Sequence, residues 1–280
     1  MNAVPAREDL TANMPPSMIL PANEAELSRT THDAIHTFNG ALDFLSAADY
    51  IRTFPPTSRI PDGRVWGPAT MNDHPEWQWR FVMTRDPATP EMFKYDFDVE
   101  PVGAGDQWIP FIKGSFVATG GARRGMGSFR IQTDELRLAG FLFAHGADGS
   151  LLKELDVIYS TAAFPISVTM DMQLYPGASA IPPDFTSVST LHYHHEAQED
   201  GQGAMEFSGT DATGKTLGIT SRWLPSGAGR ADVTATDGMG FSGTWTECWD
   251  TSFRETYNDK SWDPSMTVGY PELCPDLSSL

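Results

Sequence analysis

Residues 23–52 are the one stretch of this chain with both the length and the apolar period of a helix. Asn23 is suited to cap a helix, Glu26 follows three residues later as in a capping box, and Pro55 prevents continuation. The apolar residues recur every three or four positions: Leu27, Ala34, Ile35, Phe38, Ala41, Leu42, Leu45, Ala48 and Ile51. The spacing predicts one long helix that buries this stripe.

Gly40 lies near the middle of the predicted helix, where glycine costs about 1 kcal/mol relative to alanine. We expect either a close approach by another element or a slight break at this position. Membrane-surface binding is the alternative to core packing, but interfacial helices carry many cations on their polar face and this one has few. The pattern favours packing against the rest of the protein.

The remainder of the chain is patterned as strands and turns. Residues 77–84 and 93–100 alternate as a hairpin, and further strands are expected near residues 108–118, 125–133, 155–160 and 166–174. Residues 57–76 are predicted as a turn-rich passage, and residues 134–144 fit a short helix. From residue 186 onward five strands are separated by turns at residues 200–203, 211–214, 225–229 and 237–240.

Short connections of this kind force neighbouring strands to pair antiparallel. The predicted fold is therefore mainly β, a large curved antiparallel sheet of about 9–11 strands with one long N-terminal helix packed on it. Because such a sheet twists, we expect it to curl into a barrel or half-barrel with the helix on its concave side.

Length alone would allow two domains, but no linker divides the chain. Residues 1–22 contain four prolines and no apolar period, which predicts a flexible tether. Residues 23–54 form the helix belonging to the following domain, residues 55–262 form the antiparallel β domain, and residues 263–280 form a C-terminal tail. A tether of this kind is typical of an exported protein after removal of its signal peptide.

The formal charge is −18, from 37 acidic and 19 basic residues. Phosphate binding needs a cationic face, so nucleic acid is not an expected partner. The sequence has no run of 18 apolar residues, and its N-terminus lacks the basic and apolar regions of a signal peptide. No cofactor is expected.

The two cysteines, Cys248 and Cys274, both lie in the last 33 residues. Cys274 sits in a proline-rich tail that has little else to hold it, so a disulfide to Cys248 would have a structural use. The alternative is two unrelated buried thiols. Their spacing matches neither a redox motif nor a zinc ligand set.

Six short segments resemble a group of exported bacterial lipoproteins with a β-rich domain and no assigned function. They lie at residues 65–68 (VWGP), 112–116 (IKGSF), 125–127 (GMG), 158–159 (IY), 227–232 (GAGRAD) and 246–250 (TECWD). The resemblance covers about residues 60–260. It implies export to the periplasm, outer membrane or cell surface, and a lipid-bearing cysteine at or near the position of Met1, absent from this chain.

One strand carries candidate metal ligands. On a strand His192, His194 and Glu196 point to the same side, within reach of one metal ion. Together with Glu199 the two histidines mimic the first half of the cupin metal motif, but its glycines and second-half histidine are absent. The alternative is a polar, solvent-facing strand beside an acidic turn, and this alternative is favoured.

No catalytic residues are predicted, because the chain shows neither a Ser-His-Asp arrangement nor a nucleophile elbow. Seven aromatic side chains on strand faces either build the core or line an apolar ligand cavity: Trp77, Trp79, Phe93, Phe97, Trp223, Trp245 and Trp249.

Two functional hypotheses follow. The first is an exported, non-enzymatic binding or structural protein of the bacterial envelope, which binds an apolar small molecule or an envelope protein. Its membrane contact would be made only through an N-terminal lipid anchor. The second is a metal-dependent, cupin-like enzyme that uses His192 and His194.

Overall fold

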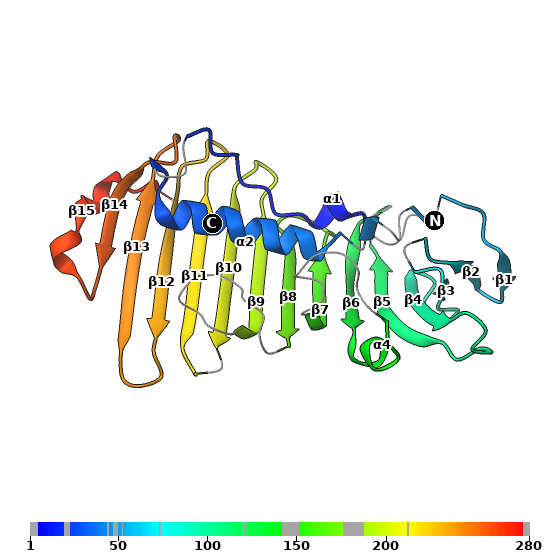
Figure 1. Ribbon diagram of the computed structural model, residues 1–280. Coiled ribbons are helices and arrows are strands. Elements are labelled where there is room, and N and C mark those ends of the chain that lie inside the picture. Colours follow the sequence, from blue (N-terminus) through cyan, green and yellow to red (C-terminus); the bar gives the residue numbers. More distant parts are fainter. Residues whose placement is uncertain are drawn as a thin grey trace. The chain divides into compact units, whose positions relative to one another are not determined.

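Fifteen antiparallel strands follow one another along the chain as neighbours in one sheet, in the order β1 to β15 (Figure 1). The structure is a computed structural model that describes residues 5–19, 23–43, 45–46, 50–51, 53–72, 74–119, 121, 123–141, 152–175, 188–211 and 213–276. Consecutive strands pair because short turns join most of them, as the sequence predicts.

The bounds of the strands are as follows. The earlier strands are β1 (Ser58–Ile60), β2 (Gly63–Thr70), β3 (Trp77–Arg85), β4 (Met92–Pro101), β5 (Ile109–Ala118), β6 (Gly125–Gln132), β7 (Leu152–Ser160) and β8 (Ile166–Leu174). The later strands are β9 (Val188–Ala197), β10 (Gly203–Asp211), β11 (Thr216–Trp223), β12 (Gly229–Thr236), β13 (Ser242–Trp249), β14 (Glu255–Lys260) and β15 (Val268–Gly269).

The mainly β, antiparallel prediction is confirmed, but the number of strands is wrong and a barrel or half-barrel is not confirmed. In the described residues the order ends at β1 and β15, which do not pair with each other. Two of the additional strands, β1 and β2, lie in the passage predicted as turns. The pairing of β2 with β3 is irregular between Trp66 and Ala69, and this irregularity interrupts the alternation by which a strand is recognised.

The chain divides into two compact units, which we describe separately. Unit 1 comprises residues 1–10, 42–163 and 172–175, and unit 2 comprises residues 11–41, 164–171 and 176–280. In unit 1, buried aromatic rings contact one another from strand to strand: Trp66, Phe81, Tyr95, Phe116, Phe129 and Tyr159. The short helix α4 (Asp134–Leu138) places Leu136 in a second cluster with Trp77, Val99 and Phe141.

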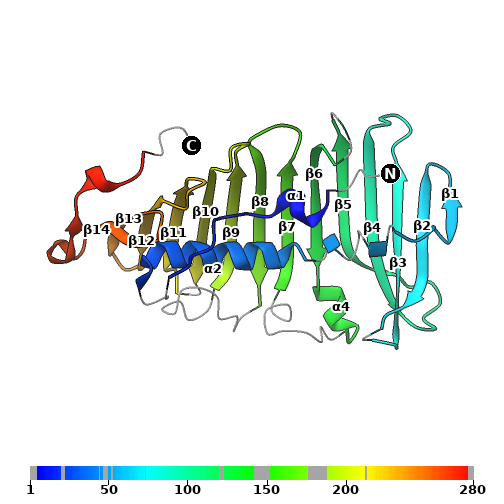
Figure 2. The same cartoon turned by 90° about the horizontal axis from the view of Figure 1, so that it is seen from above.

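In unit 2, helix α2 (Glu26–Ala41) lies across the strands around β10 and β11 (Figures 1 and 2). Its predicted apolar stripe is buried at Leu27, Ala34, Ile35 and Phe38. The hydroxyl of Thr31 also lies 2.6 Å from that of Ser221 on β11. The helix therefore packs its predicted face on the sheet.

The predicted length of this helix is wrong, because α2 ends at Ala41 rather than near Arg52. Gly40 is its next-to-last residue, and a side chain there would meet nothing within 4 Å. The glycine thus marks a break and not a close approach. Further along the stripe Leu42, Leu45 and Ile51 are buried, whereas Ala48 and Arg52 lie outside the described residues.

The start of α2 also differs from the prediction. The helix begins at Glu26, three residues after the expected cap Asn23. The amide of Glu26 donates to Glu247 Oε1 at 3.2 Å, and the amide of Leu27 donates to Glu247 Oε2. A carboxyl group from β13 therefore replaces the local capping box.

Residues 5–19 differ from the flexible tether predicted for this region. The short helix α1 (Arg7–Leu10) begins the described chain, and Ala6, Leu10 and Ala12 are buried. Within unit 2, Asn39 on α2 bonds both the amide and the carbonyl of Ala12, each at 2.9 Å. Hydrogen bonds from a side chain to the backbone can hold an extended segment that has no apolar period. The sequence pattern therefore did not show that these residues are ordered.

The tail predicted for residues 263–280 lies against the last long strand over its described part. The 3₁₀ turns η2 (Pro264–Met266) and η3 (Pro271–Leu273) both contact β14, and β15 pairs with β14 at Tyr257 and Asn258. Across the described residues, no helix is both long enough and apolar enough to cross a membrane.

Candidate functional site

The predicted histidine strand is β9, and its alternation is as expected. His192, His194 and Glu196 are partly exposed on one face, while Tyr193 and His195 are buried on the other. Each exposed histidine has its own partners. His192 Nδ1 lies 2.6 Å from Asp171 Oδ1, and His194 Nδ1 lies 2.9 Å from the hydroxyl of Thr169.

Among the described residues, one contact joins two of the predicted ligands: Glu196 Oε1 lies 3.3 Å from His194 Nε2. Glu199, the fourth residue of the cupin-like pattern, is exposed in the turn before β10. Within the described ranges, no three side chains of the types His, Cys, Asp and Glu are grouped to hold a metal ion. The face thus consists of a His192–Asp171 pair and, apart from it, His194 with Thr169 and Glu196.

His195 points into the core of unit 2, beneath α2. Its ring stacks on Trp223 at a centroid distance of 6.2 Å and meets the edge of Phe38 at 5.9 Å. Nδ1 donates to the carbonyl of Ala204 at 3.0 Å, and Nε2 has no hydrogen-bond partner among the described residues. Burial lowers the pKa of this imidazole to about 4, so it is neutral in the folded protein near neutral pH.

Lowering the pH is expected to destabilise the protein through His195. The unfolded chain binds the proton near pH 6.5 and the folded protein only near 4, so stability falls as the pH drops through this window. The full contribution is about 3 kcal/mol. Urea unfolding of the wild type and of His195→Phe between these pH values measures it, because phenylalanine keeps the stacking but cannot titrate.

The control variant is His36→Ala, which removes an exposed histidine from α2. It should retain the acid-dependent loss of stability seen in the wild type. An equally steep loss in His195→Phe would show that other groups cause it.

The aromatic residues proposed as core or cavity lining are all buried or partly buried. Trp77, Trp223 and Trp249 are almost completely buried, and Trp79 stacks on Phe97 at 5.8 Å. Trp245 is partly buried, donates from Nε1 to Asn258 Oδ1 and lies beneath the ammonium group of Lys260. These contacts are those of core packing.

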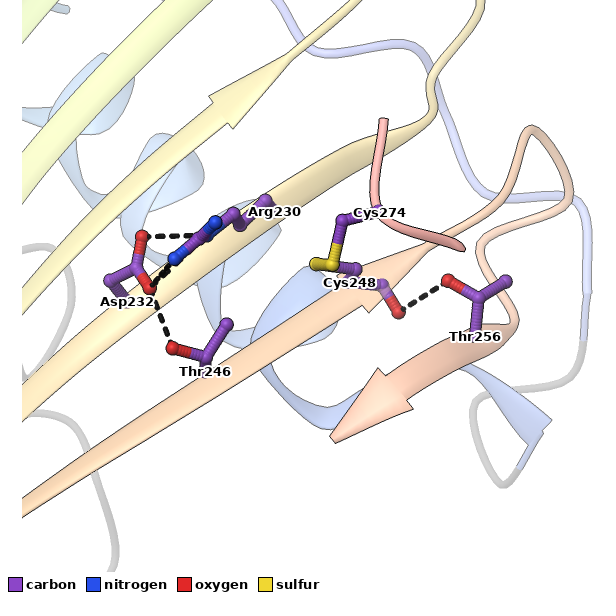
Figure 3. The surroundings of a disulfide bond; sticks show 6 residues. All are labelled: Arg230, Asp232, Thr246, Cys248, Thr256 and Cys274. Atoms are coloured by element: carbon purple, nitrogen blue, oxygen red, sulfur yellow. Dashed lines mark hydrogen bonds and ion pairs between the residues drawn. A yellow bond between two sulfur atoms is a disulfide. The ribbon is translucent and has the colours of Figure 1, made fainter. Parts of the chain in front are cut away.

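Cys248 and Cys274 are joined by a disulfide, as predicted from the isolation of the tail (Figure 3). Cys248 is fully buried on β13, and its carbonyl accepts a hydrogen bond from the hydroxyl of Thr256 at 3.2 Å. Beside it, Arg230 and Thr246 both bind the carboxylate of Asp232. The bond fixes residues after η3 to an ordered part of the sheet.

Breaking this disulfide is expected to release the tail. In Cys274→Ser, the backbone amides of β15 should lose protection from hydrogen exchange by about 2 to 4 kcal/mol, because the tail loses its covalent loop closure. The amides of β10 and β11 should keep their protection. Unchanged exchange at Val268 would mean that noncovalent contacts alone hold the tail.

The tail and the segments at the ends of β13 and β14 carry an exposed apolar surface that sequence reasoning missed. Its large side chains are Phe241, Trp262, Met266, Val268, Tyr270 and Leu273, which we call the C-terminal apolar surface. Tyr270 is 72% exposed and Met266 is 64% exposed. Because these residues lie in turns and a two-residue strand, no period in the sequence distinguishes them from an ordinary tail.

The members of this surface are held around β14. Trp262 follows β14 directly and packs against Phe241, with ring centroids 5.9 Å apart. The elements that carry the other four members are η2, β15 and the segment around η3, which contact the same strand. Adding a Cβ atom to Gly243 would overlap the ring of Trp262, so this ring lies directly on β13.

No family model, no curated protein and no solved structure matches the chain.

Proposed function

We propose that this protein is an exported, non-enzymatic binding protein of the bacterial envelope, which recognises a protein partner through the C-terminal apolar surface. The single observation that carries the proposal is the gathering of six large, exposed apolar side chains around one strand. Monomeric proteins rarely expose contiguous apolar surface unless it binds something. Aromatic side chains and methionine are also enriched at protein interfaces.

The rigidity of this surface also supports a binding role. The disulfide, the pairing of β15 with β14 and two prolines in the 3₁₀ turns restrict the backbone before any partner arrives. A surface that is already ordered pays less conformational entropy on association.

Export is supported by the disulfide, because such bonds persist mainly in oxidising compartments. The resemblance to exported lipoproteins agrees with this placement. Attachment to a membrane would then use a lipid near the N-terminus, and the folded part would act at the envelope.

A protein partner is favoured over an apolar small molecule, since the predicted cavity aromatics pack against other core side chains. The metal-dependent enzyme has less support. Among the described residues, no three side chains of the types that ligate metals are grouped around His192 and His194.

Photo-crosslinking in the cells that produce the protein tests this function. A photoreactive residue in place of Tyr270 is expected to give a discrete crosslinked species, whereas one in place of Thr234, exposed on β12, should not. The species should disappear when Trp262→Ser and Leu273→Ser are added. Identical products from both positions, or products that persist in the serine variant, would contradict the proposal.

A further inference from the structure

The C-terminal apolar surface lies in an acidic part of an acidic chain. Residues 241–276 contain seven acidic and two basic side chains. One of the two cations, Lys260, lies 3.9 Å from the centroid of the Trp245 ring and 3.7 Å from Glu26 on α2. That cation is already engaged with unit 2 itself.

Three of the acidic residues alternate with the apolar ones along the chain. Asp259 accepts a hydrogen bond from Thr267 at 3.0 Å, next to β15. Asp263 accepts one from Ser265 at 2.6 Å, at the start of η2. Glu272 is exposed within η3, between Tyr270 and Leu273. Along the chain these three carboxylates lie among the exposed aromatic and aliphatic side chains, and we call them the acidic rim.

This combination argues against three other occupants. An anionic bilayer would be repelled by the rim. In a symmetric dimer, a second copy would bring the same carboxylates against each other. Addition of a strand to the sheet edge is disfavoured because β15 is only two residues long, a common way to protect an edge.

We propose that the C-terminal apolar surface binds a positively charged, partly apolar segment of another protein. The apolar side chains of that segment would cover Trp262, Tyr270 and Leu273, and its Lys or Arg side chains would meet the acidic rim. This inference rests on the proposed function and adds the chemistry of the partner. Complementary charge would also speed the encounter at low salt.

The test uses two labelled peptides with the same apolar residues, one with lysine and one with glutamate at every polar position. Fluorescence anisotropy measures the binding of each peptide to the oxidised full-length chain. Binding of the chain to vesicles of phosphatidylglycerol is measured in parallel, and sedimentation of the chain alone reports self-association. We expect the lysine peptide to bind at least about tenfold more tightly than the glutamate peptide, and to weaken as salt increases.

Two charge variants separate the rim from the general negative charge of the chain. Asp259→Asn, Asp263→Asn and Glu272→Gln together should weaken binding of the lysine peptide by about tenfold or more. Glu199→Gln, Asp200→Asn and Glu206→Gln remove three exposed charges elsewhere in unit 2 and should change it little. Equal losses in both variants would overturn the proposal, since they would show attraction by net charge alone.

The apolar component is tested by Trp262→Ser, Tyr270→Ser and Leu273→Ser combined, which should abolish binding of the lysine peptide. Preference for the glutamate peptide, for the vesicles or for a second copy would overturn the cationic partner while leaving the surface a binding site. Absence of binding in every arm would overturn the proposed function as well.

Discussion

Replacing Phe38 with alanine is expected to lower the free energy of unfolding by about 3 to 5 kcal/mol. The side chain is fully buried, and its ring contacts Tyr193 at 6.2 Å and His195 at 5.9 Å. Truncation would leave a cavity between α2 and β9. Tyr193 and His195 could fill it only by moving away from Phe207 and Trp223, on which their rings stack. Urea unfolding followed by tryptophan fluorescence measures the change.

The matched control is His36→Ala on the exposed side of the same helix, which should change stability by no more than about 0.5 kcal/mol. The pair compares two positions with similar helix propensity and opposite burial. A loss of only a few tenths of a kcal/mol for Phe38→Ala would mean that α2 contributes little to unit 2.

Most strands of this fold could be predicted, because local patterns determine them. The turns between β9 and β13 occur where the Gly-containing segments were found, and Gly201, Gly214, Gly227 and Gly238 adopt positive φ values there. Alternation was equally informative in β3, β4 and β8. Strands without alternation, such as β2, and strands of two residues, such as β15, lack such a pattern.

The extent of α2 and the ordering of residues 5–19 depend on contacts that are distant in sequence. Trp223 donates from Nε1 to the carbonyl of Asn13, and the carbonyl of Phe253 accepts from the amide of Ala25. No periodicity in residues 11–25 reports these bonds. The disulfide also joins distant residues, but it was predictable because the chain has only two cysteines. The roles of His195 and Glu247 required the structure.

Glu247 is the most consequential of these hidden residues. It is fully buried on β13, where it accepts hydrogen bonds from the first amides of α2. Burial raises the pKa of this carboxyl group to about 8. The hydrogen bonds from the two helix amides lower the pKa, and the neighbouring Glu255 raises it. The helix start is therefore held by a carboxyl group that is mostly neutral near neutral pH.

Alkaline pH is therefore expected to weaken unit 2 through Glu247. The folded-state pKa lies above the ordinary value of 4.5, so the stabilising contribution is fully present below that pH and is lost as the pH rises through about 8. The loss should be about 3 to 5 kcal/mol, on the order expected for a shift of this size. The wild type should thus be less stable at about pH 9 than at about pH 5, once other titrations are subtracted.

The variant Glu247→Gln isolates this contribution, because the amide resembles the protonated carboxyl group in shape and cannot ionise. Relative to the wild type, it should be equally or less stable at about pH 5 and more stable at about pH 9. Urea unfolding gives the difference, and hydrogen exchange at Leu27 reports whether the start of α2 opens. The control is Glu199→Gln, an exposed residue, whose difference from the wild type should not vary with pH. If the difference for Glu247→Gln were also constant, Glu247 would have to be ionised in the folded protein, and the helix start would then be anchored by a buried carboxylate.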